Sequence, residues 1–354
     1  EAVLLTPSPW QWYSGMLPGW MAGHYRAEDC RIDLRALADA AGVRLCLASA
    51  IALDAERRML LDDTGTTHDF DLLALDVGSL VDTRALDALP TDTLLAVKPL
   101  EAFIAAWPQR LAMARAGQLR RLAVVGGGAA GVELVLAAAE AFRRADCEVA
   151  LALVAPPGGL LAGHAEGARW RVLRRLAAAG IALHPARARG TPAGLELVDA
   201  GRDAPTTLPA DCVIAATGAH APPWTQSSGL ACDAAGWVMV DAGHRSVSHP
   251  FIHAAGDVCT RADPGFARSG VHAVHAGPVL AANLFAALAG GPASAPVRSY
   301  RPRPRSLYLI ASGPRHAIAS WGRWSAEGRW VWRWKDRIDR GFIARHRRAA
   351  IVPV

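Results

Sequence analysis

Apolar stretches alternate with helix-like stretches in the first 80 residues of the chain. Ala2–Leu5, Val43–Ile51 and Phe70–Val77 are runs of mostly apolar residues, which is typical of buried strands. Between the first two runs, the apolar positions of Leu34–Ala41 recur at helical spacing. A helix that separates two buried strands predicts a β-α-β unit with parallel strands.

The same alternation continues after a connector at residues 82–99 that is rich in Thr, Asp and Pro. Helices are expected at Leu100–Arg115, Val132–Ala139, Ala165–Ala179 and from Gly270 onward. Strands are expected at Leu122–Val125, Glu148–Val154, Asp211–Ala216 and Pro250–Ala255. Strands that alternate with helices favour an α/β fold built on parallel sheets.

The end of the chain has a different pattern. A linker rich in Pro and Arg at residues 292–304 precedes the strand-like segments Ser306–Ile310 and Ala317–Trp321 and a basic helix at Trp334–Arg347. We therefore expect a small α+β unit after two α/β domains. A length of 354 residues agrees with this division, because it exceeds what one small core needs.

One long uncharged stretch, Val271–Gly291, is barely long enough to cross a membrane. It contains His272, His275, Pro278 and Asn283, and polar side chains are costly in lipid. A buried helix of a soluble domain is the better interpretation.

The formal net charge of +6 is concentrated at the end of the chain. Residues 301–348 carry 13 Arg and Lys against three acidic residues, about +10, and hold five of the twelve tryptophans. Such a tail suits contact with an anionic membrane surface, an acidic partner or nucleic acid. A solvated surface that is partly strand-paired explains it equally well.

Six cysteines are spread along the chain, with no two closer than 16 residues. They form neither a C-x-x-C redox pair nor a zinc-ligand cluster, so no metal site is expected. Reduced thiols in a cytoplasmic protein are the default interpretation. Cys259 follows Asp257 by two residues, and a buried structural thiol is the favoured interpretation of it.

The most informative motif is a glycine box that contains Gly126, Gly128 and Gly131. It directly follows the strand Leu122–Val125 and opens the helix Val132–Ala139. In this context the glycines let the backbone approach a pyrophosphate at the positive end of a helix. The box therefore predicts a dinucleotide-binding site.

Two later motifs strengthen this prediction. Thr217 and Gly218 follow one apolar strand, and Gly256 and Asp257 follow another. Glycine at the end of a strand permits close approach of a cofactor. The Asp257 carboxylate is a strong acceptor that suits the hydroxyls of a polyol, and the alternative is a helix N-cap. The order of the three motifs is typical of a flavoenzyme.

With Gly126–Glu133, Ala216–Gly218 and Phe251–Asp257, the chain resembles the pyridine nucleotide-disulfide oxidoreductases. In these flavoproteins an NAD(P)H domain interrupts an FAD domain. The resemblance implies FAD and NAD(P)H as cofactors and an α/β fold with two Rossmann-like domains. It implies an FAD domain at residues 1–98 and 249–292, an inserted NAD(P)H domain at residues 99–248, and a tail at residues 300–354.

The resemblance also implies which residues bind the cofactors. FAD is expected to contact Gly15, Gly78, Gly256, Asp257 and His272. NAD(P)H is expected to contact Gly126, Gly128, Gly131, Glu133, Thr217 and Gly218. A structural role is the alternative for His272, and the helix dipole alone favours an acid such as Glu133 in a first turn. No catalytic residue is assigned.

Three departures from the superfamily matter. Its first strand and the glycine box of its FAD domain would precede Glu1, so we expect an N-terminally truncated fragment that binds FAD weakly. Residues Ala155–Gly159 contain neither the acid that would favour NADH nor an arginine that would favour NADPH, so the nucleotide preference is open. A cysteine pair is missing where disulfide reductases carry one, so a dithiol relay is not expected.

Two segments resemble narrower groups. Tyr13–Gly19, followed by Gly23–Tyr25, is similar to a segment of type II NADH dehydrogenases. Together with Glu327–Asp336, the segment Tyr13–Gly19 resembles a branch of these flavoproteins. In bacteria, members of that branch are found fused or adjacent to selenophosphate synthetase.

The predicted function is therefore an FAD-dependent NAD(P)H oxidoreductase that passes a hydride from nicotinamide to flavin and electrons to a second acceptor. A quinone fits the respiratory resemblance, with the tail at the inner face of the membrane. A selenium or sulfur compound fits the selenophosphate synthetase branch. The alternative function is an electron donor or docking module for that synthetase. A nucleic-acid partner is not expected.

Overall fold

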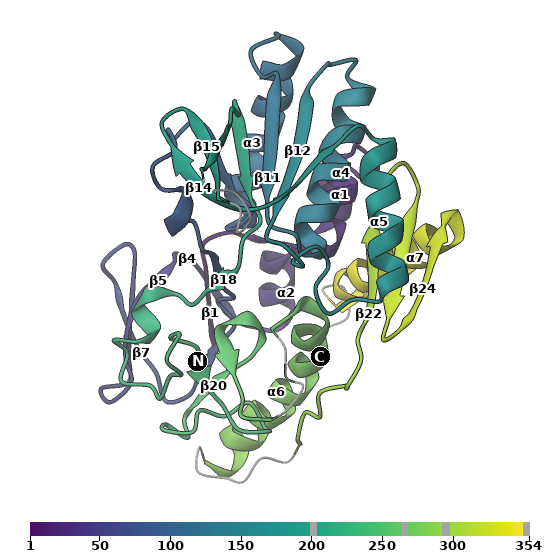
Figure 1. Cartoon of the computed structure of the whole chain (residues 1–354). Coiled ribbons are helices and arrows are strands. Elements are labelled where there is room, and N and C mark those ends of the chain that lie inside the picture. Colours follow the sequence, from purple (N-terminus) through teal and green to yellow (C-terminus); the bar gives the residue numbers. More distant parts are fainter. Residues whose placement is uncertain (199–203, 264–265, 267, 292–297, 350–354) are drawn as a thin grey trace.

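The computed structural model describes residues 1–198, 204–263, 266, 268–291 and 298–349. Its upper half in Figure 1 contains a parallel sheet with the strand order β10-β17-β11-β12-β13, which we call the central sheet. Its strands are β10 (Leu94–Ala96), β11 (Arg121–Val125), β12 (Ala150–Ala155), β13 (Ala182–Pro185) and β17 (Cys212–Ala215). The α/β fold class expected from the sequence is confirmed.

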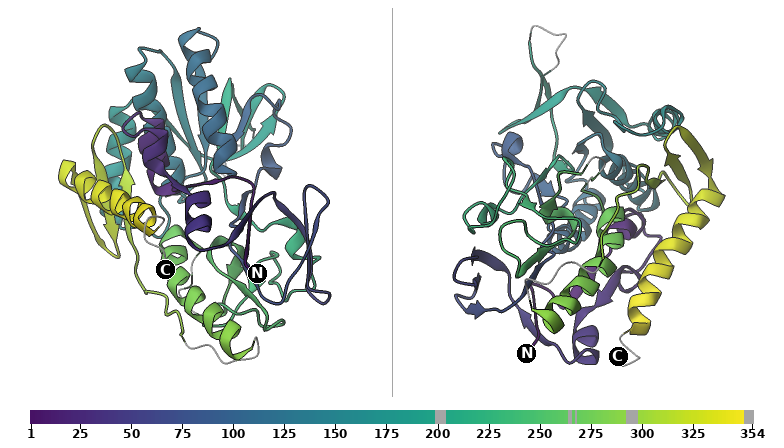
Figure 2. Two further views of the ribbon diagram at one scale, coloured as in Figure 1. Left: turned by 180° about the vertical axis from the view of Figure 1, so that it is seen from behind. Right: turned by 90° about the horizontal axis from the view of Figure 1, so that it is seen from below.

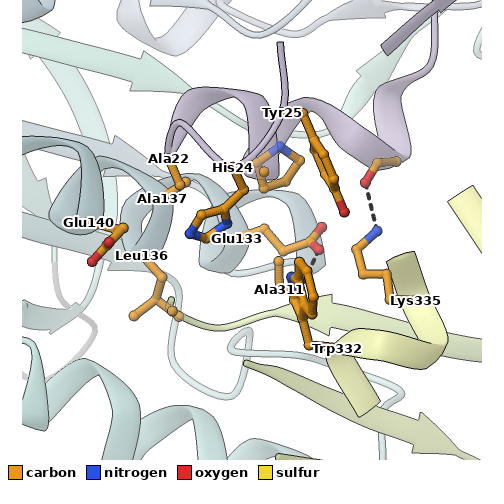
Figure 3. A pocket seen from close by; sticks show the side chains of 14 residues that line it. Ala22, His24, Tyr25, Glu133, Leu136, Ala137, Glu140, Ala311, Trp332 and Lys335 are labelled. Atoms are coloured by element: carbon orange, nitrogen blue, oxygen red, sulfur yellow. Dashed lines mark hydrogen bonds between the residues drawn. The ribbon is translucent and has the colours of Figure 1, made fainter. Parts of the chain in front are cut away.

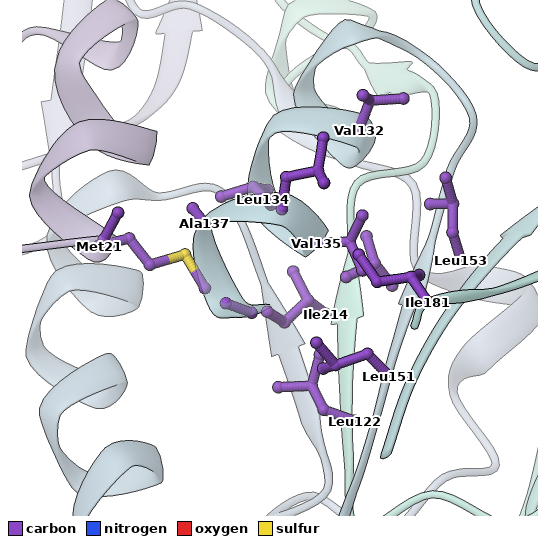
Figure 4. Close-up of a cluster of buried hydrophobic side chains, with 14 of the residues drawn as sticks. Met21, Leu122, Val132, Leu134, Val135, Ala137, Leu151, Leu153, Ile181 and Ile214 are labelled. Atoms are coloured by element: carbon purple, nitrogen blue, oxygen red, sulfur yellow. The ribbon is translucent and has the colours of Figure 1, made fainter. Parts of the chain in front are cut away.

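The central strands are apolar throughout because both faces of the sheet are covered. Leu122 and Val124 of β11 pack on one face, and Ala123 and Val125 point the opposite way into a second core. The first face carries the helices α3 (Leu100–Arg115), α4 (Ala129–Arg144) and α5 (Glu166–Ala178). Figure 4 shows side chains of α4 packed against the strands in this core. The second face carries the antiparallel strands β14 (Arg187–Thr191), β15 (Gly194–Val198) and β16 (Thr206–Leu208).

Two parallel strand pairs form a second unit. β1 (Val3–Thr6) pairs with β4 (Arg44–Leu47), and α2 (Leu34–Ala40) lies between them in the sequence, as the β-α-β prediction requires. β8 (Leu73–Leu75) pairs with β20 (Ile252–Ala254), so a late segment joins an early one. The domain boundaries expected from the sequence, and the strand and glycine box expected before Glu1, stay predictions.

Two expected strands are shorter than predicted. The run at residues 43–51 divides into β4 and β5 (Ala50–Asp54), because the chain turns at Ser49, whose amide donates to Asp63 Oδ1 (2.9 Å). The run at residues 70–77 is extended only in β8. Apolar character alone does not reveal such turns. β5 pairs in an antiparallel sheet with β6 (Met59–Asp62) and β7 (Thr67–Asp69).

The remaining elements are short. The helical ones are η1 (Ser14–Met16), α1 (Leu17–Met21), η2 (Ala27–Cys30), η3 (Arg84–Leu86), η4 (Pro223–Thr225) and η5 (Gly256–Val258). The short strands are β2 (Trp10–Trp12), β3 (Arg31–Asp33), β9 (Leu80–Val81), β18 (Ala219–His220), β19 (Val238–Met239) and β21 (Cys259–Thr260).

A small C-terminal unit packs beside the central sheet. It is an antiparallel sheet of β22 (Leu307–Ala311), β23 (Ala317–Trp321) and β24 (Trp324–Gly328), followed by α7 (Arg329–Ala349). The expected strands and helix are confirmed, although β24 was not predicted and the helix begins before Trp334. Glu327 of β24 faces Arg171 and Arg174 of α5 at 3.7 and 3.4 Å. Beyond this sheet, α7 runs along the outside of the molecule to α2 and β3 (Figure 2).

The helix α6 (Gly270–Gly290) corrects one expectation. Only His272, Ala276, Asn283 and Ala287 are buried, whereas Phe285 and Leu288 are 72% and 69% exposed. The prediction of a buried helix is therefore wrong for its outer face. Within the described residues, this is the one helix that is long and apolar enough to cross a membrane. The Asn283 amide donates to the Gly243 carbonyl oxygen (2.8 Å), which ties the inner face to the second unit.

Gly131 and Gly128 offer a matched test of the packing at the start of α4. A Cβ on Gly131 would lie 1.9 Å from the Gly126 carbonyl oxygen, whereas one on Gly128 would meet no atom within 4 Å. We expect Gly131→Ala to cost about 1–3 kcal/mol of unfolding free energy, because the backbone of the turn must move. Gly128→Ala should leave the melting temperature nearly unchanged. Scanning calorimetry of both variants checks this, and equal losses would contradict the packing described.

Candidate functional site

The carboxyl ends of the two sets of parallel strands face each other. Lys98 follows β10 of the central sheet, and Asp257 follows β20 of the second unit. The Lys98 ammonium donates to Asp257 Oδ2 (2.9 Å) and to Ser79 Oγ (2.8 Å). Ligands of open α/β sheets bind beyond the carboxyl ends of strands. This junction is therefore the first candidate site, and Lys98 is a residue that the sequence did not single out.

The glycine box forms the turn between β11 and α4, as predicted. Gly126 has a φ of +133°, and a Cβ there would lie 2.1 Å from the Ala216 carbonyl oxygen. Gly131 packs against Gly126 from the other side. Gly128 is the N-cap of α4 and has free space where a Cβ would be. The turn is tightly packed inside and open at Gly128, where a pyrophosphate has access to the helix N-terminus.

Thr217 and Gly218 link the central sheet to the second unit. Thr217 Oγ1 donates to the Asp82 carbonyl oxygen (2.6 Å), and the Asp82 amide donates to the Gly218 carbonyl oxygen (2.9 Å). β18 pairs with β9 immediately beside this contact. Both predicted residues therefore lie at the junction, and their contact with NAD(P)H stays a prediction.

Gly78, Gly256 and Asp257 line the other side of the junction. The two glycines have φ values of +68° and +74°. A Cβ on Gly256 would lie 2.7 Å from Asp76 Oδ1, whereas one on Gly78 would meet nothing within 4 Å. Asp257 Oδ1 is buried and has no hydrogen-bond partner among the described residues. An unpartnered buried carboxylate oxygen is costly, and a ligand hydroxyl would satisfy it.

His272 lies in the first turn of α6, whose N-terminus is next to Gly256. Its ring Nδ1 is 2.5 Å from Tyr300 Oη, and Phe266 packs beside it. Loss of hydration lowers the pKa of His272. The side chain thus has a structural partner, and its contact with FAD stays a prediction.

A second group of polar side chains lies where α7 meets α4 and the N-terminal segment (Figure 3). Lys335 Nζ donates to the Gly15 carbonyl oxygen (2.6 Å) and to Asp339 Oδ2 (2.8 Å). Glu133 Oε1 accepts from the Ala311 amide of β22 (2.7 Å). We call Glu133, Lys335 and Asp339 the Lys335 cluster.

The charges of the Lys335 cluster depend on one another. Burial acts against the charged form of Lys335, but the carboxylates of Glu133 and Asp339 outweigh it and raise the pKa of Lys335. Loss of hydration raises the pKa of Glu133 to about 7, although Lys335 and the Ala311 amide act in the opposite direction. Burial likewise raises the pKa of Asp339, against the pull of Lys335. Glu133 therefore exchanges a proton near neutral pH, beside a permanent cation.

A small pocket opens onto the Lys335 cluster. Its walls are mostly apolar, with polar groups at the edges, and are formed by Gly15, Pro18, Gly19, Ala22, His24, Tyr25, Glu133, Leu136, Ala137, Glu140, Ala311, Gly313, Trp332 and Lys335. Tyr25 Oη donates to Asp336 Oδ1 (2.8 Å), which holds one wall to α7. The pocket's volume of about 20 Å³ has room for about one water molecule, so it can receive only the end of a ligand. We call this space the Glu133 pocket.

The structure separates two predicted residues from the junction. Gly15 and Glu133 lie in the Glu133 pocket, so their contacts with FAD and NAD(P)H stay predictions. The prediction that Glu133 lies in the first turn of the helix is wrong, because α4 begins at Ala129 and Glu133 is its fifth residue. Lys335, His24 and Trp332 are new members of the site. Lys335 and Trp332 lie in the segment Glu327–Asp336, on which the resemblance to the selenophosphate synthetase branch rests. The sequence of that segment does not show which residues they contact in the fold.

The family model described as pyridine nucleotide-disulphide oxidoreductase matches residues 22–278. The chain belongs to this family. A search of the curated proteins gives no match.

Solved structures share the fold. Sulfide:quinone oxidoreductase from Aquifex aeolicus is 14% identical with a TM-score of 0.78, and the match covers 98% of this chain and 85% of that chain. NDH2 from Plasmodium falciparum, in complex with NADH, is 12% identical with a TM-score of 0.79, and the match covers 96% and 92%. At these identities the likeness extends to the fold alone.

As a member of the pyridine nucleotide-disulphide oxidoreductases, the chain is an FAD-dependent NAD(P)H oxidoreductase, as the sequence predicted. Its six cysteines all lie within the described residues and are all unpaired. Burial raises the pKa of the Cys259 thiol to about 12, so this sulfur close to the junction stays protonated at neutral pH.

Asp257 provides a direct test of the junction. We expect Asp257→Ala to weaken FAD binding about 10- to 100-fold, the loss expected for a hydrogen bond to a charged group. Flavin occupancy after dialysis, measured by absorbance, checks this. Asp92→Ala is the control, because Asp92 is exposed. Equal occupancy in the two variants would remove Asp257 from the site.

Proposed function

We propose that the protein transfers electrons from NAD(P)H, through FAD at the junction, to a small acceptor in the Glu133 pocket. The observation that carries this proposal is the pair of sites on opposite sides of the N-terminal part of α4. The glycine box lies on one side, and the protonatable Glu133 lies on the other. The enzyme reacts first with NAD(P)H and then with the acceptor, so it needs a binding site for each.

The residues at the junction fit the two cofactors in part. The open side of Gly128 suits the pyrophosphate of NAD(P)H. The unpartnered Asp257 Oδ1 suits a ribityl hydroxyl of FAD. Bound FAD would supply the hydride and electron chemistry, and the protein positions the reactants. Lys98 and Ser79 fix the Asp257 carboxylate by holding its second oxygen.

In the Glu133 pocket, the chain itself can supply a proton. Many acceptors take up protons when they are reduced, and a carboxyl with a pKa near 7 donates well at neutral pH. Lys335 stabilises the carboxylate that remains, because it is a fixed positive charge in a poorly hydrated site. Trp332, Leu136 and Ala137 form apolar walls that keep water away.

A quinone that reaches the pocket with one edge suits its apolar walls, and a sulfur or selenium compound is the alternative. The narrower placement with type II NADH dehydrogenases, or with the selenophosphate synthetase branch, is part of the same proposal. Assays of NAD(P)H oxidation against both kinds of acceptor distinguish them. If the flavin-loaded protein reduces neither kind, the proposal of a small acceptor fails.

We also propose a peripheral membrane contact through α7. Trp330 and Trp334 are 52% and 38% exposed, and their rings stack at 6.4 Å. Ile338 continues this exposed stripe, and Arg333 and Arg337 are exposed on the same helix. Aromatic and apolar residues flanked by arginines suit the surface of an anionic membrane. A docking partner is the alternative occupant, and vesicle co-sedimentation of a Trp330→Gln, Trp334→Gln variant tests the membrane.

Glu133→Gln tests the proton donor. The folded-state pKa of Glu133 is raised from 4.5 to about 7, so the stability it contributes is complete below pH 4.5 and is lost as the pH rises through 7. Glutamine does not ionise, so the variant should gain about 1–3 kcal/mol relative to wild type between pH 5 and pH 8. Its acceptor reduction should be slower and independent of pH across this range. Parallel melting and rate profiles check both points.

Glu140→Gln is the control, because Glu140 lines the same pocket but accepts two hydrogen bonds from Arg143 (both 2.8 Å). It should retain the pH dependence of the wild type. If Glu133→Gln keeps that dependence too, another group is the donor.

A further inference from the structure

A second pocket adjoins the Glu133 pocket and shares His24 and Glu140 with it. Its remaining lining residues are Gly23, Arg144, Pro314, Arg315 and Arg329. We call this space the vestibule, because it lies beside the Glu133 pocket and is more open and more polar. Three arginines from three different elements converge there.

The vestibule has an excess of positive charge. Arg144 donates to the carbonyl oxygens of Ala22 and Gly23 (3.0 and 2.7 Å), which leaves its charge uncompensated. Arg315 and Arg329 have no carboxylate within ion-pair distance among the described residues. The one acidic residue in the lining, Glu140, is already held by Arg143.

The side chains of these arginines are exposed, and the backbone fixes the positions from which they extend. Arg315 lies in the short turn between β22 and β23, which is closed by hydrogen bonds between Ser312 and His316 (2.9 and 2.8 Å). Arg329 is the first residue of α7. Gly23 has a φ of +74°, a backbone conformation that favours glycine, and its carbonyl oxygen accepts from Arg144 Nη1 (2.7 Å). Burial and the charges of Arg144 and Arg315 lower the pKa of His24, against Glu140, so its imidazole is neutral at pH 7.

We propose that the vestibule binds an oxyanion at the outer end of the Glu133 pocket. The proposal rests on the function proposed above. Guanidinium groups bind phosphate, carboxylate and related oxyanions through parallel hydrogen bonds, and a concave site with charges of one sign concentrates the oppositely charged ligand. The oxyanion belongs either to a soluble acceptor or to an anionic lipid headgroup at the same place.

The test uses the intact protein and inorganic phosphate, without turnover. Isothermal titration at low ionic strength should show saturable binding of one phosphate per chain. The double variant Arg315→Gln, Arg329→Gln should weaken it at least tenfold. The matched control is Arg333→Gln, Arg337→Gln, which removes the same charge from exposed positions of α7 outside the lining. Equal weakening in both double variants, or no saturable binding in the wild type, would overturn the proposal.

Two further arms identify the source of the oxyanion. If it belongs to the acceptor, the vestibule variant should raise KM for a carboxylated or sulfonated quinone and leave KM for a neutral quinone and kcat unchanged. If it belongs to a lipid, the variant should lose affinity for phosphatidylglycerol vesicles relative to a variant that removes two arginines of β14, Arg187→Gln, Arg189→Gln. A failure of electron transfer with every acceptor, with phosphate binding intact, would count against the proposed function and not against the vestibule.

Discussion

The buried charge of Lys335 constrains how the parts of this molecule assemble. An ammonium removed from water needs both hydrogen bonds and an opposite charge. Lys335 obtains them from the Gly15 carbonyl oxygen, 320 residues earlier, and from Asp339 one turn along α7. Glu133 of α4 lies within its field. The N-terminal segment, the central domain and the C-terminal helix must therefore come together before this charge is satisfied. The Glu133 pocket exists only in that assembled state.

The N-terminal part of α4 separates two kinds of chemistry. Successive residues of a helix are rotated by about 100°, so Gly131 and Glu133 point about 200° apart. Gly131 faces Gly126 and Ala216, where the helix meets the strand ends. Glu133 faces Ala311 of the C-terminal sheet. The segment Gly126–Glu133 looks like one site in the sequence. In the structure its glycines face the junction and Glu133 faces the Glu133 pocket, with the backbone of α4 between them.

The elements that could be predicted are those with a local signal. The apolar runs of β11, β12 and β17 and the glycine box that follows β11 gave the central sheet and its nucleotide-binding turn. The ends of β4 and β8 could not be placed, because an apolar run continues through a turn. Lys335, Lys98 and His24 were missed for a different reason. The role of each depends on a partner far away in the sequence, such as Asp257 for Lys98. A single sequence does not show that two such residues are close in space.

The basic tail also shows why composition alone was ambiguous. Five of its thirteen basic residues lie in three different surroundings. Lys335 is directed inward and is compensated by Asp339. Arg315 and Arg329 line the vestibule, and Arg333 and Arg337 lie on the exposed face of α7. The buried Lys335 holds the parts of the protein together, and the converging Arg315 and Arg329 suit a small anion. The exposed Arg333 and Arg337 suit an anionic membrane surface. The net charge of the tail therefore does not reveal the role of any one basic residue. The role of each group is tested by comparing a variant of that group with a variant that removes the same charge from another group.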